Sequence, residues 1–243
     1  MSRQIPEIIV PGSLFVPTLN DQFSIVAGGM PNGDDCLRVD GAADTNHSAW
    51  QDANLGVNTV NGPINSSGGN KILAFWFRVI SGLSAFSSYP SGVGQAVNPP
   101  MPNCLWSHSC DRNTTASADV VWAFLLHSDR VSLVGRSSVR YADGNWGDGT
   151  WHFVIAETQG VGSPISLYVD GTPYTATTSI SANGASFNGN GRVGIGNVQP
   201  DAGNTSRRGV DGIVDIGKLA VLETPMPSNF ERQALFDAMM SAA

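Results

Sequence analysis

The feature that most constrains the fold of this chain is the stretch 148–171, which reads D-G-T-W-H-F-V-I-A-E-T-Q-G-V-G-S-P-I-S-L-Y-V-D-G. It contains two runs of β-branched and aromatic residues, 151–156 and 165–169, and each is bordered by an Asp-Gly pair. Such runs between Gly and Asp are typical of β-strands. Because Asp170-Gly171 accepts the positive φ angles of a type I′ turn, we expect a hairpin that returns through 173–177.

Turn signals of the same kind recur along the chain, and short runs rich in β-forming residues lie between them. This pattern predicts an all-β fold, an antiparallel β-sandwich of the jelly-roll type. The expected strands are 23–27, 36–40, 71–80, 119–127, 131–136, 151–157, 165–169, 192–196 and 213–222. The chain of 243 residues has the length of one large all-β domain, which we place at 21–243.

A short helix is predicted at the C-terminal end, over 228–241. Ser228 and Glu231 form an S-x-x-E capping box, which marks a helix N-terminus. An apolar stripe follows at Phe230, Leu235, Phe236 and Met239. We expect this helix to pack on the edge of the sandwich, and a role in an interface is the alternative.

Residues 1–20 are predicted to be an extended N-terminal arm, because prolines at positions 6, 11 and 17 exclude a helix. The apolar residues of the arm are Ile8, Ile9, Val10, Leu14 and Phe15. The arm could add an edge strand to its own sandwich. Alternatively, it reaches a neighbouring subunit, where these five residues add a strand or fill a groove.

Several motifs also resemble a known family. The D-G-T-W-H-F strand followed by S-L-Y-V-D-G resembles the laminin-G-like branch of the concanavalin A-like lectin and glucanase superfamily. Four further segments follow the order of that family: C-L-R-V-D-G at 36–41, the apolar run at 72–80, G-R-V-G-I-G at 191–196, and the strand at 215–221 before the helix. The resemblance covers residues 36–240 and implies a lectin-like jelly roll.

The charge of the chain excludes one class of partner. The formal net charge is −7 and the isoelectric point is about 4.9. Such an anionic surface repels phosphate backbones, so we exclude nucleic acid. No apolar run reaches the ~20 residues of a membrane span. The N-terminal sequence M-S-R-Q-I-P-E has no apolar signal core, and we therefore expect synthesis in the cytosol without a signal peptide.

Three cysteines, Cys36, Cys104 and Cys110, are too few for a disulfide framework. Cys104 and Cys110 could pair if the intervening L-W-S-H-S forms a loop. Otherwise they are free thiols that pack as small apolar residues. With His108 they lack the fourth ligand that zinc requires, so we predict no zinc site.

Catalytic motifs are missing from the sequence. Glycoside hydrolysis requires two carboxylates that face the scissile bond. The four glutamates are Glu7, Glu157, Glu223 and Glu231, and none lies in the E-x-D-x-E pattern of the glucanases in this superfamily. His152 lies in the W-H strand, where the resemblance implies a structural role. Because nucleophile-elbow, phosphate-loop, dinucleotide and H-E-x-x-H motifs are also absent, we predict that the protein is not an enzyme.

Two groups of residues are candidates for ligand binding. Tyr141, Asp143, Asn145 and Trp146 combine aromatic and hydrogen-bonding groups in one predicted loop, as a sugar site requires, and Trp106 is a second aromatic candidate. A loop tryptophan can equally cap the sandwich or face another subunit, because aromatic residues are enriched in interfaces.

Calcium is the one cofactor for which the sequence offers candidate ligands. Asp34, Asp35, Asp40 and Asp44 form the densest acidic stretch, and Ca²⁺ prefers clustered carboxylate oxygens. A solvated turn is the alternative. The family often carries an acidic residue in the segment that Gly217-Lys218 occupies here, which argues against a calcium site of the family type.

These observations favour a non-catalytic structural protein that contacts other subunits of a larger assembly. A virion component, such as a phage capsid decoration or head/tail protein, fits the expected cytosolic synthesis, the lectin-like domain and the apolar arm. A carbohydrate-binding lectin or adhesin is the first alternative, and a polysaccharide-active enzyme is the second.

Overall fold

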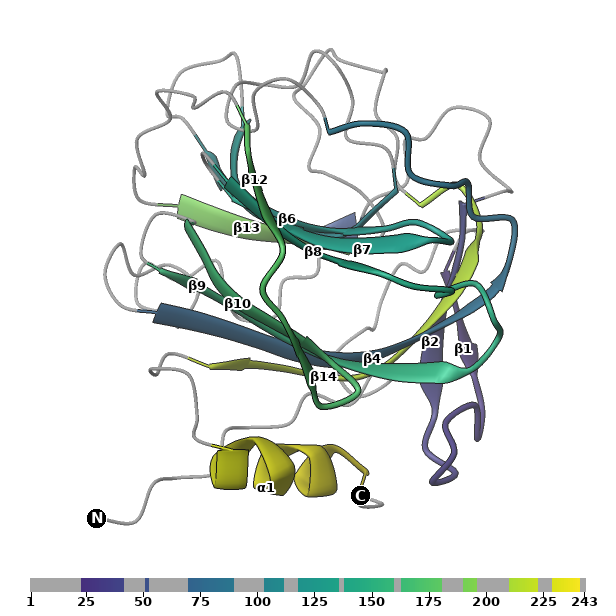
Figure 1. Ribbon diagram of the computed structural model, residues 1–243. Helices are drawn as coiled ribbons and strands as arrows, with labels where there is room; N and C mark the ends of the chain where they lie inside the picture. Colours follow the sequence, from purple (N-terminus) through teal and green to yellow (C-terminus); the bar gives the residue numbers. More distant parts are fainter. Residues whose placement is uncertain are drawn as a thin grey trace.

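The fold is an antiparallel β-sandwich, as the sequence predicts. The computed structural model describes residues 23–41, 51–52, 70–89, 103–111, 118–135, 138–159, 163–180, 190–195, 210–222 and 229–240. Within these ranges, fourteen strands form two seven-stranded sheets that lie in two layers (Figure 1). The predicted arm at 1–20 lies outside the described residues, so its two interpretations remain open.

The first sheet has the order β1 (Phe23–Val26), β2 (Cys36–Asp40), β14 (Ile213–Leu222), β4 (Asn70–Ser81), β9 (Trp151–Gln159), β10 (Ser163–Val169) and β11 (Thr172–Tyr174). The second sheet has the order β12 (Thr177–Ser179), β8 (Ser138–Asp143), β7 (Arg130–Val134), β6 (Ala118–Leu126), β5 (Cys104–Asp111), β13 (Asn190–Ile195) and β3 (Gln51–Asp52). Neighbouring strands in both sheets are antiparallel. The C-terminal strand β14 lies between β2 and β4, so distant parts of the sequence share one sheet.

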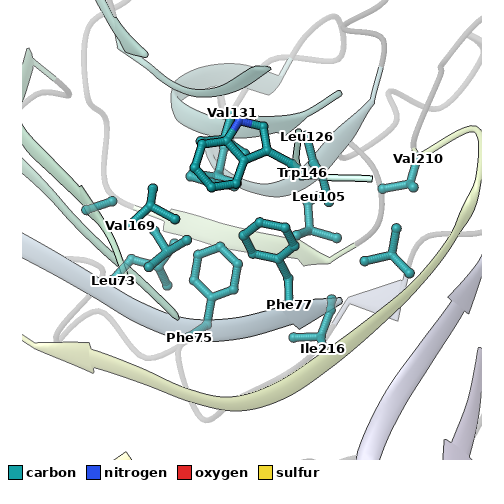
Figure 2. Packing of buried hydrophobic residues seen from close by; sticks show 14 of the residues in the cluster. Leu73, Phe75, Phe77, Leu105, Leu126, Val131, Trp146, Val169, Val210 and Ile216 are labelled. Atoms are coloured by element: carbon teal, nitrogen blue, oxygen red, sulfur yellow. The ribbon is translucent and has the colours of Figure 1, made fainter. Parts of the chain in front are cut away.

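The apolar run of β4 explains how the sandwich is layered. Alternate side chains of this strand, including Phe75 and Phe77, face the second sheet and belong to the main core. Figure 2 shows them pointing into the same space as Leu105 and Val131 of the second sheet. The intervening side chains, such as Trp76, are also buried, in a second apolar cluster on the outer face. A continuous apolar run is typical of a strand that is covered on both faces.

Helix α1 (Asn229–Met240) covers that outer face. Leu235 and Met239 are buried in the second cluster, and the Phe236 ring centroid lies 5.4 Å from that of Trp76. Figure 1 shows the helix beneath the first sheet, on the side away from the second sheet. The expected position on the sandwich edge is therefore wrong. The physical reason is that the apolar outer face of β4 and β9 needs a cover, which the apolar stripe of the helix provides.

A bulge in β14 keeps its side chains in register with the core. The pairing with β4 shifts between Ile216 and Leu219, so that Gly217 and Lys218 oppose a single residue of β4. Ile216 and Leu219 both reach the main core, although they are three residues apart.

The nine expected strands are present, with small differences at their ends. Strand β11 is the return strand of the expected hairpin, whereas β3, β5, β8 and β12 are strands that the sequence patterns did not predict. Cys104 and Cys110 both lie on β5, which is a strand and not a loop. Six residues of strand span about 20 Å, far beyond the Cα separation of a disulfide, so these two cysteines do not pair with each other. The described residues contain no helix long and apolar enough to cross a bilayer.

Candidate functional site

The two halves of the 148–171 motif meet at His152, a buried residue of β9. Nδ1 of His152 lies 2.7 Å from Oδ2 of Asp170, which follows β10. The other carboxylate oxygen of Asp170 accepts a hydrogen bond of 2.8 Å from the backbone N–H of Phe153. Asp170 and Gly171 have φ angles of 51° and 77°. The expected hairpin is confirmed, because Val169 pairs with Thr172 across these two residues.

A second carboxylate, Asp148, lies on the other side of the imidazole. Its Oδ1 is 3.3 Å from Nε2 of His152 and accepts hydrogen bonds from the N–H and hydroxyl of Thr150, at 2.8 and 2.7 Å. Burial by itself lowers the pKa of His152, but the hydrogen bonds and charges of Asp170 and Asp148 outweigh burial and raise it. Burial by itself raises the pKa of Asp148. Its hydrogen bonds with Thr150 and His152 lower that pKa by a larger amount, so it lies below its ordinary value.

Thr150, His152 and Asp170 are the residue types of a catalytic triad, but their hydrogen bonds do not fit that role. Oγ1 of Thr150 lies 3.2 Å from Nε2 of His152, but the hydroxyl donates its proton to the closer Asp148 carboxylate, at 2.7 Å, whereas a nucleophile would donate it to the imidazole. This geometry supports the structural role predicted for His152: the side chain ties the turn before β9 to the turn after β10.

Tyr141 and Asp143, two of the predicted sugar-binding residues, lie together on β8 and contact Arg130 of β7. The Arg130 guanidinium donates to both carboxylate oxygens of Asp143, at 2.6 and 3.1 Å. Its central carbon also lies 4.2 Å from the ring centroid of Tyr141 and 4.3 Å from that of Phe86. This arrangement is a compact stacked cluster, because Arg130 covers one face of the Tyr141 ring.

Trp146 is buried in the main core and is 6% exposed. Its Nε1 donates a hydrogen bond of 3.0 Å to the carbonyl of Ala142, and Figure 2 shows the indole beside Val131 and Leu126. The expectation of an exposed stacking surface at Trp146 is therefore wrong, and the alternative, a tryptophan that caps the sandwich, is correct. The indole faces inward because the turn after β8 folds back onto the turn between β6 and β7, where the backbone N–H of Trp146 donates to the carbonyl of Ser128.

The two remaining sugar-binding candidates are Asn145 and Trp106. Asn145 is exposed in the turn after β8. Trp106 lies on β5, opposite Phe124 and Ile195, and its side chain lies outside the described residues.

The acidic stretch proposed for calcium is engaged in other contacts. Oδ2 of Asp34 lies 2.7 Å from Nζ of Lys218, a buried lysine of the β14 bulge, and accepts a hydrogen bond from Asn32. Oδ1 of Asp35 accepts a hydrogen bond from the backbone N–H of Gly28. Asp40 lies on β2, and Asp44 lies outside the described residues. Among the described residues, no group of three or more acidic, histidine or cysteine side chains could hold a metal ion.

A groove of about 530 Å³ lies between helix α1 and the outer face of the first sheet. Strand β9 supplies Phe153 and Ile155, which are buried. One wall consists of Tyr168 and the hairpin residues Asp170, Gly171 and Pro173. The other wall consists of Arg232, Gln233 and Phe236 of the helix. This groove is the candidate functional site.

The walls of the groove are joined by a stacking contact. The central carbon of the Arg232 guanidinium lies 4.2 Å from the ring centroid of Tyr168. Deeper in the groove, the rings of Phe153 and Phe236 meet edge to face, with centroids 5.4 Å apart. Aromatic and charged contacts thus fix the helix against β9 and β10.

No motif in the sequence marks this groove as a site. Phe236 belongs to the predicted apolar stripe of the helix, and Asp170-Gly171 to the predicted turn. Arg232, Gln233 and Pro173 carry no motif. The signal available in sequence was a helix with a partly polar face, and the position of that face depends on where the helix docks.

The protein is thus an antiparallel β-sandwich with a helix on one outer face and a groove beside that helix. No protein-family model and no curated protein matches the chain. Among solved structures, it is similar to the binding domain of Paraclostridial Mosquitocidal Protein 1, with 11% identity and a TM-score of 0.45, over 96% of this chain and 47% of that chain.

It is also similar to the receptor binding domain of botulinum neurotoxin D, with 11% identity and a TM-score of 0.41, over 96% of this chain and 47% of that chain. A third similar structure is of botulinum neurotoxin type C, whose cell entry is described as dependent on two ganglioside molecules. The identity is 13% and the TM-score 0.41, over 90% of this chain and 45% of that chain. The chain thus spans less than half of these structures, and at such low scores the similarity carries no inference about function.

Proposed function

We propose that the protein is a non-catalytic binding domain, a sandwich that contacts a partner without transforming it. The observation that carries this proposal is that several carboxylates pair with basic side chains of the same domain. Asp215 is buried and accepts hydrogen bonds from both Arg38 and Arg78, at 2.7 and 2.6 Å. The Asp34–Lys218 and Asp143–Arg130 pairs follow the same pattern.

Each of these carboxylates pairs with an arginine or a lysine side chain. A glycosidase acid must instead be protonated, which requires a raised pKa, whereas the pKa of Asp148 is lowered. Glu157, the strand glutamate, is buried and accepts a hydrogen bond from the Ser166 hydroxyl. These contacts support a structural use of the acidic residues.

We further propose that the domain works as a virion component, a phage capsid decoration or head/tail protein. The support is in the sequence: a lectin-like sandwich preceded by an arm with two apolar segments, which suits contact with neighbouring subunits. We also propose that the sandwich is of the laminin-G-like type. The His152–Asp170 contact supports this, because it explains why the W-H and V-D-G motifs occur together.

The virion proposal is tested by antibody labelling of particles purified from the producing culture, in negative-stain images and in sedimented fractions. We expect the protein on the particles. A variant with Ile9→Asp and Leu14→Asp should sediment with them less, because charged groups would enter an apolar contact. A matched variant with Gln4→Asp and Asn20→Asp adds the same charge at polar positions and should still sediment. Particles without the protein would disprove the virion proposal.

Carbohydrate binding is the second candidate function, and the groove beside α1 is the observation that favours it. It is concave and combines aromatic walls with three polar side chains at its rim, the usual composition of a small-molecule site.

A further inference from the structure

The groove beside α1 presents two kinds of surface to a ligand. Its accessible apolar surface comes from Tyr168 and Phe236, which are half-buried, and from Pro173, which is exposed. Its polar groups are the carboxylate of Asp170, the guanidinium of Arg232 and the amide of Gln233. A ligand that satisfies both kinds must have an apolar face and hydrogen-bonding edges.

The charges of the lining select a neutral ligand. Among the described residues of the lining, one is acidic, Asp170, and one is basic, Arg232. An anion that binds the guanidinium meets the carboxylate of the same groove, and a cation that binds the carboxylate meets the guanidinium, so neither gains a net attraction. A neutral ligand can accept a hydrogen bond from the guanidinium and donate one to the carboxylate.

Both charged groups are held in place before a ligand arrives. Asp170 is fixed by His152 and by the backbone of Phe153, and its side chain is 47% exposed. Arg232 is fixed by stacking on Tyr168. Groups that are already positioned lose less conformational freedom on binding, which favours affinity.

The hairpin turn leaves room for a ligand to approach the backbone. Apart from its two chain neighbours, no atom of the described residues lies within 4 Å of the position that a Cβ on Gly171 would occupy. The groove volume of about 530 Å³ lies within the ~300–1,000 Å³ range of small-molecule sites.

We propose that this groove binds a neutral saccharide, a hexose or N-acetylhexosamine residue of a glycan. The carbon–hydrogen face of the sugar ring lies against Phe236 and Pro173, because Arg232 already covers one face of the Tyr168 ring. Its hydroxyl groups donate to Asp170 and accept from Arg232. Nε2 of Gln233 already donates to Asp237, at 2.9 Å, so it is the amide oxygen of Gln233 that accepts from a further hydroxyl or an acetamido N–H. This assignment rests on the proposed binding function and names the ligand class.

The test is a glycan array of neutral hexose, N-acetylhexosamine and sialylated oligosaccharides, followed by calorimetry with the best-bound oligosaccharide. Gln233→Trp places a large side chain in the groove from an exposed helix position and removes no core contact. Ala234→Trp makes the matched change at the next exposed position of the helix, outside the groove lining. Thermal melts that agree with the wild type establish that both variants fold.

We expect binding to neutral glycans, a loss of affinity of at least about tenfold in Gln233→Trp, and little change in Ala234→Trp. The saccharide assignment is wrong if no neutral glycan binds, if only sialylated glycans bind, or if both variants bind like the wild type. Displacement of the bound glycan by an unrelated peptide would also overturn it. Association with particles, the readout of the virion proposal, does not depend on Gln233→Trp, so the two proposals fail separately.

Discussion

His152 shows how one side chain can hold two turns together. The residue contacts Asp170 after β10 and Asp148 before β9, and its ring packs against Trp146, with centroids 5.2 Å apart. The turn after β8, the hairpin and the core tryptophan therefore share one buried contact. The sequence indicated a structural histidine here, but only the structure identifies its partners.

The raised pKa of His152 predicts a pH-dependent stability. A histidine whose folded pKa is raised stabilises the protein fully below the unfolded value of about 6.5, and this contribution is lost as the pH rises through the folded pKa. His152→Gln should therefore cost most at low pH, about 1.5–3 kcal/mol for lost hydrogen bonds to charged groups. Urea unfolding of both proteins between pH 5.5 and 8.5 measures the difference.

The difference between wild type and variant should shrink as the pH rises. A difference in free energy of unfolding that stays constant or grows with pH would contradict the raised pKa of His152. His127 acts in the opposite sense, because burial lowers its pKa and its contribution is lost as the pH falls. Since both proteins retain His127, its effect cancels in the comparison.

At the scale of elements, the sequence predicts strands with strong intrinsic preference and misses those that depend on their neighbours. Intrinsic patterns predicted nine strands correctly because runs such as that of β4 are apolar and β-branched. Strand β5, C-L-W-S-H-S-C-D, was missed because its serines and cysteines read as a loop. Its neighbours β6 and β13 provide ladder hydrogen bonds on both sides, and this context outweighs weak intrinsic preference.

Substitution of two glycines by alanine should destabilise the fold for different reasons, backbone strain at Gly171 and crowding at Gly217. Gly171 has a φ of 77° and open space around it. Gly171→Ala should therefore cost only the strain of a left-handed backbone, about 1–2 kcal/mol. At Gly217, a Cβ would lie 2.8 Å from the Met30 side chain and from the Cβ of Trp76. Gly217→Ala should cost about 1–3 kcal/mol through overpacking.

Near-ultraviolet circular dichroism distinguishes the two causes. The tryptophan signal should change in Gly217→Ala, because Trp76 must move, and should stay the same in Gly171→Ala. Equal spectra in both variants would show that the bulge tolerates a side chain.

At the scale of the whole molecule, helix α1 closes the outer face of the first sheet and completes the groove. Leu235 is buried against the second apolar cluster. Leu235→Ala should lower the free energy of unfolding by about 2–4 kcal/mol, because a buried leucine is replaced by a cavity. Ala238→Gly, a change of the same helix without loss of a large apolar side chain, should cost about 1 kcal/mol.

Chemical denaturation of the two variants tests this role of the helix. A cost for Leu235→Ala no larger than that for Ala238→Gly would mean that the helix is not a structural cover. The groove would then lack one of its walls, because Arg232, Gln233 and Phe236 belong to the helix.

The sequence by itself determined the strands with strong alternation, the Asp170-Gly171 hairpin and the helix, because these follow from backbone conformation and periodicity within a few residues. It also indicated that the carboxylate pattern of a glucanase is missing. Only the tertiary structure decided that Trp146 is buried, that Asp34 pairs with Lys218, and that α1 and the hairpin enclose a groove. These features join residues far apart in the chain, and their contacts exist only once the sheets and the helix have packed.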